Sequence, residues 1–558
     1  MAEQLLANVA RATSDLPDNH TALVLGDRRT SFAELDSRAN KVANGLLALG
    51  VIDQERVAIL DHSSDQFYEV WIGAARANLA LTPLNIRLSA LEIAQILADC
   101  RPRVLFVGAA FEKVLNEIKS ELDFIEHYIV MGEAYASWRD PQSDYRCESS
   151  MGLLDDCLQI YTSGTTGLPK GVRLSSESIF KAPLSSLISG ERSPCQQFGP
   201  EDVILLCLPH AHVAGSILGI YGLAMGSRLI VVSDFVPTEI AVIIEREQVT
   251  LTLMVPVMVN GLLAAIASTG RTCKSLKKIL YGAAPMATSL LKKAMAALPH
   301  TGFGQIYGLT ETSGPITYLT AEDHHEILQG NEDLALSCGK ATAGVEIRVI
   351  DVFGQSLPAG GIGEIICRST QVMNGYWRRK EETLQVIQDG WFHTGDMGYI
   401  DKRGFLYIYD RKRDMIITGG ENVYPAEVEN ILYSHHAIAD VAVIGVPDQH
   451  WGEAVKAVVV LKPGASLTLD ELIAHAKGKV AGFKIPKTVD FVEDLPRNAT
   501  GKVLRRLIRE PYWKHHARES PDSLALLISR RSHAFNTASL KGIHDERRKK
   551  TWRSTDSC

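Results

Sequence analysis

Short apolar runs alternate with amphipathic stretches over the first 300 residues of the chain. The stretch 31–50 begins with a Ser, has a Glu three residues later and ends at a Gly, which predicts a helix with a capping box and a glycine C-terminus. A buried strand at 56–60, a helix at 65–79 and a turn at Thr82-Pro83 are expected next. A further helix is expected at 91–100, and further strands at 104–108, 203–209, 228–232, 251–256 and 277–285. This alternation predicts an α/β fold with mixed, largely parallel sheets and flanking helices.

From about residue 344 the pattern changes to short alternating strands with Gly-centred turns. We therefore expect a large N-terminal domain, 1–410, that includes a β-rich subdomain at about 340–410. The charged stretch DRKRD (410–414) interrupts the apolar pattern and predicts a domain boundary. The pattern over residues 411–517 predicts a small α+β domain with two helices and two strands. The basic segment 518–558 has no clear periodicity and is expected to be disordered, with contact to nucleic acid or an anionic surface as the alternative.

Composition narrows the class of protein. A net charge of −7 with 46% hydrophobic residues argues against a protein that coats nucleic acid or a polybasic membrane protein. The nine cysteines form no CxxC pair, which favours reduced thiols. The N-terminus does not resemble a signal peptide, and no apolar run approaches the roughly 20 residues of a transmembrane helix. A cytoplasmic protein is expected, while a peripheral membrane contact and a homodimer stay open.

The segment YTSGTTGLPKG (161–171) carries the strongest chemical signal. Its three glycines leave backbone N–H groups free to point into a concavity, hydroxyl groups add donors, and a lysine adds positive charge. This combination suits a polyphosphate. The segment is not a Walker A loop, because Lys170 is followed by Gly171 rather than Ser or Thr. The expected phosphate-binding residues are Thr162, Ser163, Gly164, Thr165, Thr166, Gly167 and Lys170.

This segment resembles the phosphate loop of the adenylate-forming superfamily, which includes acyl-CoA synthetases, firefly-type luciferases and the adenylation domains of peptide synthetases. Six further segments follow in that family's order and resemble its adenine, adenine-and-metal, ribose, hinge, mobile-loop and catalytic-lysine segments. They are GAAP (282–285), QIYGLTE (305–311), WFHTGD (391–396), DRKRD (410–414), GGENVYP (419–425) and PRNATGK (496–502). The resemblance covers roughly residues 20–515. It implies a ligase that makes acyl-AMP and pyrophosphate from ATP and a carboxylic acid, then transfers the acyl group to coenzyme A and releases AMP.

The resemblance also implies a role for each matching residue. Glu311 would coordinate Mg²⁺, which prefers hard oxygen ligands, and Thr310 would contact phosphate. Lys502 would bridge the carboxylate and the α-phosphate in the transition state. Asp396 would accept the ribose hydroxyls, assisted by Arg411. The remaining nucleotide contacts implied are Gly282, Ala283, Ala284, Pro285, Gln305, Tyr307 and Gly308.

For the second step, the resemblance implies that the small domain swings about the hinge and replaces the lysine loop with GGENVYP. Gly420 suits a channel for the pantetheine arm, because a glycine lines it with backbone alone. The residues that resemble coenzyme A contacts of relatives are Arg87, Trp451, Phe483 and Lys487. Ile485 stands where relatives can carry a basic residue, which weakens the implied grip on the nucleotide.

The segment LPHAHVAGS (208–216) matches a family segment that reads Pro-x-aromatic-His, so His212 would position the substrate carboxylate. Ala211 replaces the aromatic residue, which either opens the pocket or is compensated elsewhere. His210 and His212 lack a third ligand nearby for a metal. The residues expected to line the acyl pocket are small or neutral: Val213, Ala214, Tyr281, Gly282, Gly308, Ser313 and Gly314.

The substrate follows from this neutral wall. No carboxylate lies between Leu208 and Gly226 to hold an amino group, and a buried neutral pocket disfavours charged substrates. A medium- or long-chain fatty acid is expected, with free coenzyme A as acceptor because no carrier domain follows. An aryl or cinnamate-type CoA ligase is the alternative within the same chemistry. A non-catalytic nucleotide-binding paralogue is the alternative of another class.

Overall fold

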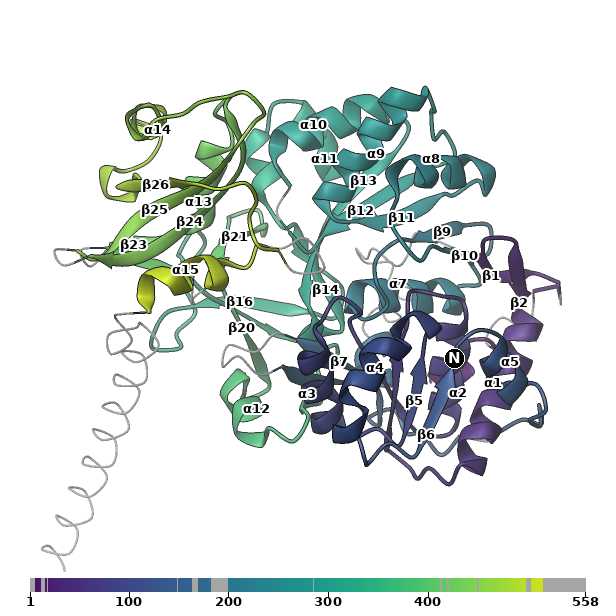
Figure 1. Ribbon diagram of the computed structural model, residues 1–558. Coiled ribbons are helices and arrows are strands. Elements are labelled where there is room, and N and C mark those ends of the chain that lie inside the picture. Colours follow the sequence, from purple (N-terminus) through teal and green to yellow (C-terminus); the bar gives the residue numbers. More distant parts are fainter. Residues whose placement is uncertain are drawn as a thin grey trace, which may run out of the picture. The chain divides into compact units, whose positions relative to one another are not determined.

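The computed structural model describes residues 6–11, 16–17, 19–147, 149–162, 169–181, 199–284, 286–411, 414–418, 421–448, 451–497 and 503–514. Contacts divide the chain into two compact units. Unit 1 is Met1–Arg413 with Arg497–Lys502, and unit 2 is Asp414–Pro496 with Val503–Cys558. The predicted tail 518–558 lies outside the described residues. The structure confirms an α/β fold, with sheets and helices that alternate along the chain (Figure 1).

The first sheet of unit 1 has the strand order β18-β8-β7-β4-β3-β5-β6. Its centre is parallel, and β7, β8 and β18 extend it with antiparallel pairs. The strands are β3 (Arg56–Leu60), β4 (Ala80–Pro83), β5 (Val104–Val107), β6 (His127–Val130), β7 (Asp156–Thr162), β8 (Lys170–Ser175) and β18 (Gly375–Tyr376). The helices around it are α1 (Phe32–Ala48), α2 (Gln66–Arg76), α3 (Ala90–Cys100), α4 (Glu112–Ile118) and α5 (Glu133–Arg139).

The second sheet has the order β15-β14-β13-β12-β11-β9-β10-β1-β2. Its strands are β1 (Thr21–Leu25), β2 (Arg28–Ser31), β9 (Val203–Leu206), β10 (Arg228–Val231), β11 (Leu251–Met254), β12 (Lys278–Gly282), β13 (Gly302–Leu309), β14 (Gly314–Leu319) and β15 (Lys340–Ala341). Its helices are α7 (Val213–Ala224), α8 (Pro237–Arg246), α9 (Pro256–Thr269), α10 (Thr288–Ala297) and α11 (Ala321–Leu328).

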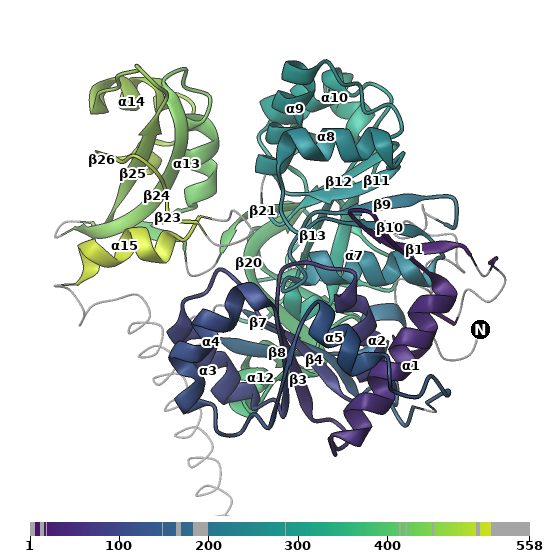
Figure 2. The ribbon, with the colours of Figure 1, turned by 45° about the vertical axis from the view of Figure 1, so that its right-hand side comes forward.

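Three apolar clusters stack these elements in layers. One cluster fills the space between the two sheets and includes side chains of α1, α2 and α7. A second joins the other face of the second sheet to α8, α9, α10 and α11. A third joins the other face of the first sheet to α3 and α4 (Figure 2). Because both faces of each sheet are covered, the strands read as continuous apolar runs rather than as alternating ones.

A third, antiparallel sheet follows, as the change of pattern near residue 344 predicts. It consists of β16 (Glu346–Ile350), β17 (Gly363–Arg368), β19 (Ile387–Gln388), β20 (Trp391–Ile400) and β21 (Leu406–Arg411), and α12 (Lys380–Val386) precedes β19. In β20 and β21, Asp396 is the register partner of Arg411. The sheet therefore places the predicted ribose-binding residue opposite the start of the charged hinge segment.

Unit 2 is built on one sheet with helices on both faces. Apolar side chains of α13 and α14 cover one face, and α15 covers the other. The elements are β22 (Ile416–Thr418), β23 (Glu421–Val423), α13 (Pro425–Leu432), β24 (Ile438–Asp448), β25 (Gly452–Leu461), α14 (Leu469–Ala476), β26 (Thr488–Phe491) and α15 (Arg505–Trp513). Two arginines of α15 form ion pairs: Arg505 pairs with Glu429 at 2.6 Å, and Arg509 with Glu453 at 2.9 Å.

Most predicted elements are present, and one prediction is wrong. The capping box on α1 forms, with Ser31 accepting from the backbone of Glu34. Thr82 and Pro83 do not form a turn; they are the last residues of the buried strand β4. Pro83 is tolerated there because a proline at a strand end removes no interior ladder bond. The described residues contain no helix that is long and apolar enough to cross a bilayer.

Candidate active site

The ends of the phosphate-loop segment belong to one hairpin. Strands β7 and β8 pair antiparallel, and Thr162 is the register partner of Lys170. The five intervening residues that we predict to bind phosphate lie outside the described residues: Ser163, Gly164, Thr165, Thr166 and Gly167. Strands β7 and β8 form the stem of this hairpin, the phosphate-loop stem, and the stem fixes where the loop begins and ends. Lys170 lies at its downstream end.

The short strand β18 brings a distant segment against this stem. Tyr376 and Gly375 pair with Val172 and Arg173 of β8. The hydroxyl of Tyr376 donates to Oε1 of Glu311 at 3.0 Å, and the ammonium of Lys170 lies 5.0 Å from the centre of the Tyr376 ring. Tyr376 thus links the predicted metal ligand to the predicted phosphate-binding lysine.

A carboxylate on α12 also contacts Lys170. Nζ of Lys170 lies 2.5 Å from Oε2 of Glu382, and Nη1 of Arg379 lies 3.0 Å from Oε1 of the same side chain. Sequence reasoning missed both Tyr376 and Glu382. Neither belongs to a periodic pattern, and only the pairing of β18 with β8 brings them to the stem.

Glu311 itself lies on a single 3-10 turn, η5 (Thr310–Thr312), between β13 and β14. The backbone carbonyl of Glu311 accepts from the amide of Met373 at 2.9 Å, so this turn is also held by the segment that leads into β18. The turn ends at Ser313, whose φ of 52° is left-handed. The structure therefore places Thr310 and Glu311 on one backbone turn beside the phosphate-loop stem.

Two glycines set how closely the adjacent strands approach. A Cβ on Gly282 would lie 2.3 Å from the carbonyl oxygen of Ile306, and a Cβ on Gly308 would lie 2.0 Å from that of Gly314. Both contacts are with backbone, so no side chain can give way. Ala283, with a φ of 62°, and Ala284 follow Gly282 at the end of β12, while Pro285 lies outside the described residues.

Gly308→Ala is expected to lower the stability of unit 1 by about 1–3 kcal/mol, because the added methyl group would force β13 and β14 apart. The thermal unfolding midpoint measures this. Gly302→Ala is the matched control on the same strand, since its Cβ would meet its nearest neighbour, the Cβ of Ala321, at 3.4 Å. Equal midpoints for the two variants would contradict the close approach.

The predicted adenine and ribose residues come together beside these strands. The hydroxyl of Tyr307 donates to Oδ2 of Asp396 at 2.6 Å, and Asp396 is only 5% exposed. Burial, and then the Asp396 carboxylate, raise the pKa of Tyr307 well above its ordinary value, so the phenol remains a donor. Oε1 of Gln305 is buried without a hydrogen-bond partner among the described residues. An acceptor with no partner is free to receive a ligand's N–H group.

His212 is the N-cap residue of helix α7 and is partly buried. Burial, with a smaller contribution from Arg87, lowers the pKa of His212 to about 4. His210 is 5% exposed, its ring centroid lies 4.3 Å from that of Phe67, and burial lowers its pKa to about 3. Both histidines are therefore neutral at pH 7. No group of three His, Cys, Asp or Glu side chains among the described residues could hold a metal ion.

The neutral histidines predict that acid destabilises the fold. A histidine whose pKa is lowered in the folded state contributes stability that is full above about pH 6.5 and is lost as the pH falls. When the pH falls from 7 to 5, His210 and His212 should each lower the free energy of unfolding by about 2 kcal/mol. Thermal unfolding at the two pH values measures this.

The control for this prediction compares two substitutions. His210→Gln should make the loss on acidification smaller, because one buried titrating ring is removed. His300→Gln, at an exposed position, should leave it unchanged. An equal loss in all three proteins would show that the His210 ring does not carry the effect.

Two of the residues expected to line the acyl pocket lie in one apolar cluster. Val213 and Ala214 of α7 pack in the same apolar cluster as Ile306, Tyr307 and Leu309. Tyr281 does not belong there: it is 2% exposed in the cluster on the other face of the sheet, and its hydroxyl lies 2.9 Å from Nε2 of His324. Strand alternation explains the error, since neighbours on a strand face opposite sides.

The residues predicted to contact coenzyme A are spread over the chain. Arg87 is exposed and lies close enough to His212 to lower its pKa. In unit 2, Phe483 and Lys487 lie together on the surface, with Lys487 Nζ 3.5 Å from the carbonyl of Gly482, and Trp451 follows β24 and is 47% exposed. Gly420 and Lys502 lie outside the described residues, and of Arg411 only the backbone is described.

Comparison with known proteins decides the family. Residues 9–377 match the AMP-binding enzyme family, and residues 427–502 match the AMP-binding enzyme C-terminal domain. The chain belongs to the AMP-binding enzyme family. It is an AMP-forming acid–thiol ligase of the adenylate-forming superfamily, as the order of its motifs predicts, and the non-catalytic alternative is set aside.

Relatives match over nearly the whole chain. The fatty acid–[acyl-carrier-protein] ligase ScoC of Streptomyces coeruleorubidus is 34% identical over 89% of this chain and 95% of its own. The long-chain-fatty-acid–CoA ligase FadD13 of Mycobacterium tuberculosis is 35% identical over 87% and 94%, and the feruloyl-CoA synthase of an Amycolatopsis species 33% over 88% and 96%. The crystal structure of ATP-bound MatB from Rhodopseudomonas palustris superposes with a TM-score of 0.81, at 30% identity over 91% and 99%.

Proposed function

We propose that this ligase activates a medium- or long-chain fatty acid with ATP and transfers the acyl group to coenzyme A. The carboxylate attacks the α-phosphorus, pyrophosphate leaves, and the thiol of coenzyme A then displaces AMP from the acyl-adenylate. Two anions meet in the first step, so the site must supply positive charge and positioning more than acid–base chemistry. The arrangement of Lys170, Glu311 and Asp396 in unit 1 supports this assignment.

ATP and magnesium fit the described residues. The Tyr307–Asp396 pair offers a carboxylate for the ribose hydroxyls, and the free Oε1 of Gln305 can accept from the adenine amino group. Glu311 offers a carboxylate oxygen beside the phosphate-loop stem, where Mg²⁺ bound mainly through phosphates and water would need one protein ligand. Mg²⁺ would neutralise phosphate charge there, and Tyr376 would hold the carboxylate in place.

The choice of a fatty acid rests on the apolar side chains of the expected acyl pocket. The first residues of α7 and the end of β13 share an apolar cluster, and the segment between Leu208 and Gly226 has no carboxylate. FadD13 and ScoC are named for fatty acids, which supports an aliphatic chain. The feruloyl-CoA synthase is named for an aromatic acid, so an aryl acid is the second candidate.

Coenzyme A is the acceptor that we propose, with Arg87, Gly420, Trp451, Phe483 and Lys487 as contacts. FadD13 and the feruloyl-CoA synthase are named for coenzyme A, which supports this acceptor. ScoC is named for an acyl-carrier protein, which makes a separate carrier protein the competing acceptor.

Release of AMP across a panel of acids tests both choices. The panel contains fatty acids of rising chain length, benzoate and cinnamate. Each acid is tested with coenzyme A and, separately, with a holo acyl-carrier protein as the acceptor. We expect the highest kcat/KM with a fatty acid of medium or long chain and with coenzyme A. A preference for cinnamate or benzoate would contradict the proposed fatty acid. Turnover with the carrier protein but not with coenzyme A would contradict the proposed acceptor.

A further inference from the structure

The stem of the phosphate loop carries two cations and one carboxylate. Lys170 is 13% exposed and pairs with Glu382 at 2.5 Å, and Arg379 is 22% exposed and pairs with the same carboxylate at 3.0 Å. Nη2 of Arg379 also lies 3.5 Å from the carbonyl oxygen of Pro169, directly before Lys170. Both cations therefore lie at the stem itself, and Glu382 is their shared counter-ion.

Glu382 is ionised in this setting. Burial alone would raise its pKa, but hydrogen bonds from Lys170 and Arg379 hold the pKa below the ordinary value for a glutamate. The three charges at the stem sum to +1, whereas a neutral residue at position 382 would leave +2. A polyphosphate bound beside the stem would experience this difference directly, because partly buried charges are weakly screened.

We infer that Glu382 is a positioning residue that tempers the positive charge of the phosphate-loop stem, so that pyrophosphate is held during adenylation and released afterwards. The inference rests on the proposed function, in which this loop binds the polyphosphate of ATP. A ligase gains nothing from holding its product as tightly as its transition state. Glu382 partly neutralises the charge of Lys170 and Arg379 and thereby limits their affinity for pyrophosphate.

The sign of the effect separates this role from a structural one. With Glu382→Gln the stem gains one net positive charge, so we expect the inhibition constant of pyrophosphate and the KM for ATP both to fall, by about three- to tenfold. A residue that merely holds α12 in place would, when replaced, loosen the site and raise both constants. Glu382→Asp keeps the charge and should stay within about twofold of the wild type.

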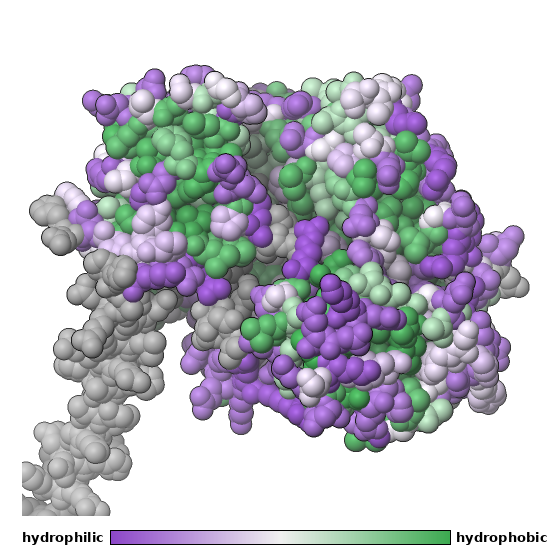
Figure 3. Space-filling view, in the orientation of Figure 1, coloured by the Kyte–Doolittle hydropathy of each residue, from purple (hydrophilic) through white to green (hydrophobic). Residues whose placement is uncertain are grey.

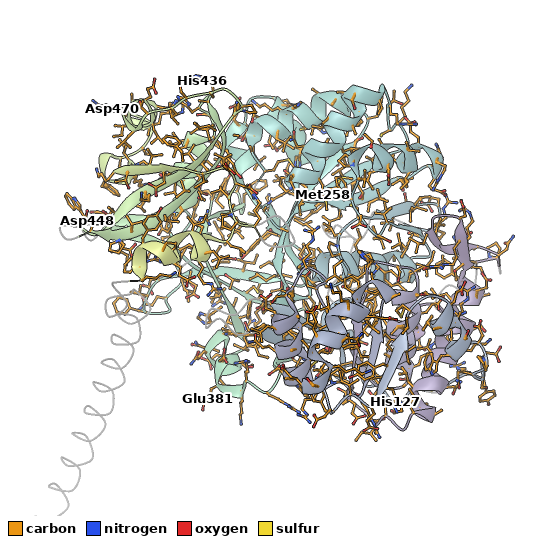
Figure 4. The ribbon with its side chains drawn as sticks, viewed as in Figure 1. His127, Met258, Glu381, His436, Asp448 and Asp470 are labelled. Atoms are coloured by element: carbon orange, nitrogen blue, oxygen red, sulfur yellow. The ribbon has the colours of Figure 1, made fainter. Side chains whose placement is uncertain are left out.

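Glu381 supplies the matched control. It is the neighbouring residue on α12, it is exposed, and it lies at the outer edge of the helix in Figure 4. Hydrophilic residues gather on the surface around α12 (Figure 3), and a neutral amide at the exposed position 381 changes the net charge of the chain by the same amount as Glu382→Gln. Glu381→Gln should leave the inhibition constant of pyrophosphate unchanged.

The experiment measures product inhibition by pyrophosphate and ATP–pyrophosphate exchange in the full chain, for wild type, Glu382→Gln, Glu382→Asp and Glu381→Gln. Tighter pyrophosphate inhibition in Glu382→Gln alone supports the inference. Unchanged or weaker inhibition in Glu382→Gln would overturn it, even if exchange persists. Absence of acid-dependent exchange in the wild type would instead overturn the proposed function, so the two failures are distinguishable.

Discussion

Lys502→Ala is expected to lower acid-dependent ATP–pyrophosphate exchange by at least about 10²-fold, while thioester formation from supplied acyl-AMP stays within about threefold of the wild type. In the first step the ammonium group would stabilise the charge that develops between the carboxylate and the α-phosphate. In the second step the adenylate already exists, and the resemblance places the GGENVYP loop, not the lysine loop, at the site.

The two half-reactions are measured separately, by exchange of labelled pyrophosphate and by thioester yield from synthetic acyl-AMP. Lys477→Ala, at an exposed position after α14, is the control for the loss of one lysine elsewhere on the chain. If Lys502→Ala impaired both half-reactions equally, the lysine would have no special part in adenylation, and its assignment would be wrong.

Asp396→Ala is the substitution with the second-largest expected effect. The carboxylate is 5% exposed, and Tyr307 donates to it at 2.6 Å. If Asp396 also accepts the ribose hydroxyls, its removal loses two hydrogen bonds to a charged acceptor, each worth about 1.5–3 kcal/mol. We expect kcat/KM for ATP to fall by about 10²-fold or more, mainly through KM, in a steady-state assay with saturating acid.

Tyr307→Phe separates the ribose contact from the support of the carboxylate. This variant keeps the aromatic ring and removes only the hydroxyl that donates to Asp396, so kcat/KM for ATP should fall by less than about tenfold. If instead Asp396→Ala kept a KM for ATP within twofold of the wild type, Asp396 would be a structural partner of Tyr307 and not a ribose ligand.

The sequence predicts local elements better than their assembly. Helix α1 follows from its capping box, and the apolar runs locate most strands. The pairing of strands does not follow: β1 and β2, at the start of the chain, lie at the edge of the second sheet beside β10, and β18 completes the first sheet. Such pairings depend on contacts between distant segments, which a local pattern does not record. The end of β4 is predicted wrongly as a turn because a Thr-Pro pair is also typical of turns.

The same limit applies to the site. Motif order points to Lys170, Glu311 and Asp396, and the structure shows that Tyr376 connects the first two and Tyr307 contacts the third. Glu382 has no motif that marks it. Its part depends on the side chains of α12 meeting the stem of a hairpin formed far earlier in the chain. Tyr281 shows the reverse error, a residue beside a motif whose side chain points into another core.

Transfer of oxygen from the acid to AMP tests the central claim most directly. The preferred acid, labelled with ¹⁸O in its carboxylate, is turned over with ATP and coenzyme A, and the AMP is analysed by mass spectrometry. Attack of the carboxylate on the α-phosphorus leaves one labelled oxygen in the AMP phosphate, so we predict one ¹⁸O per AMP for each thioester formed. Unlabelled AMP, or label in orthophosphate with ADP as the product, would contradict activation through an acyl-adenylate.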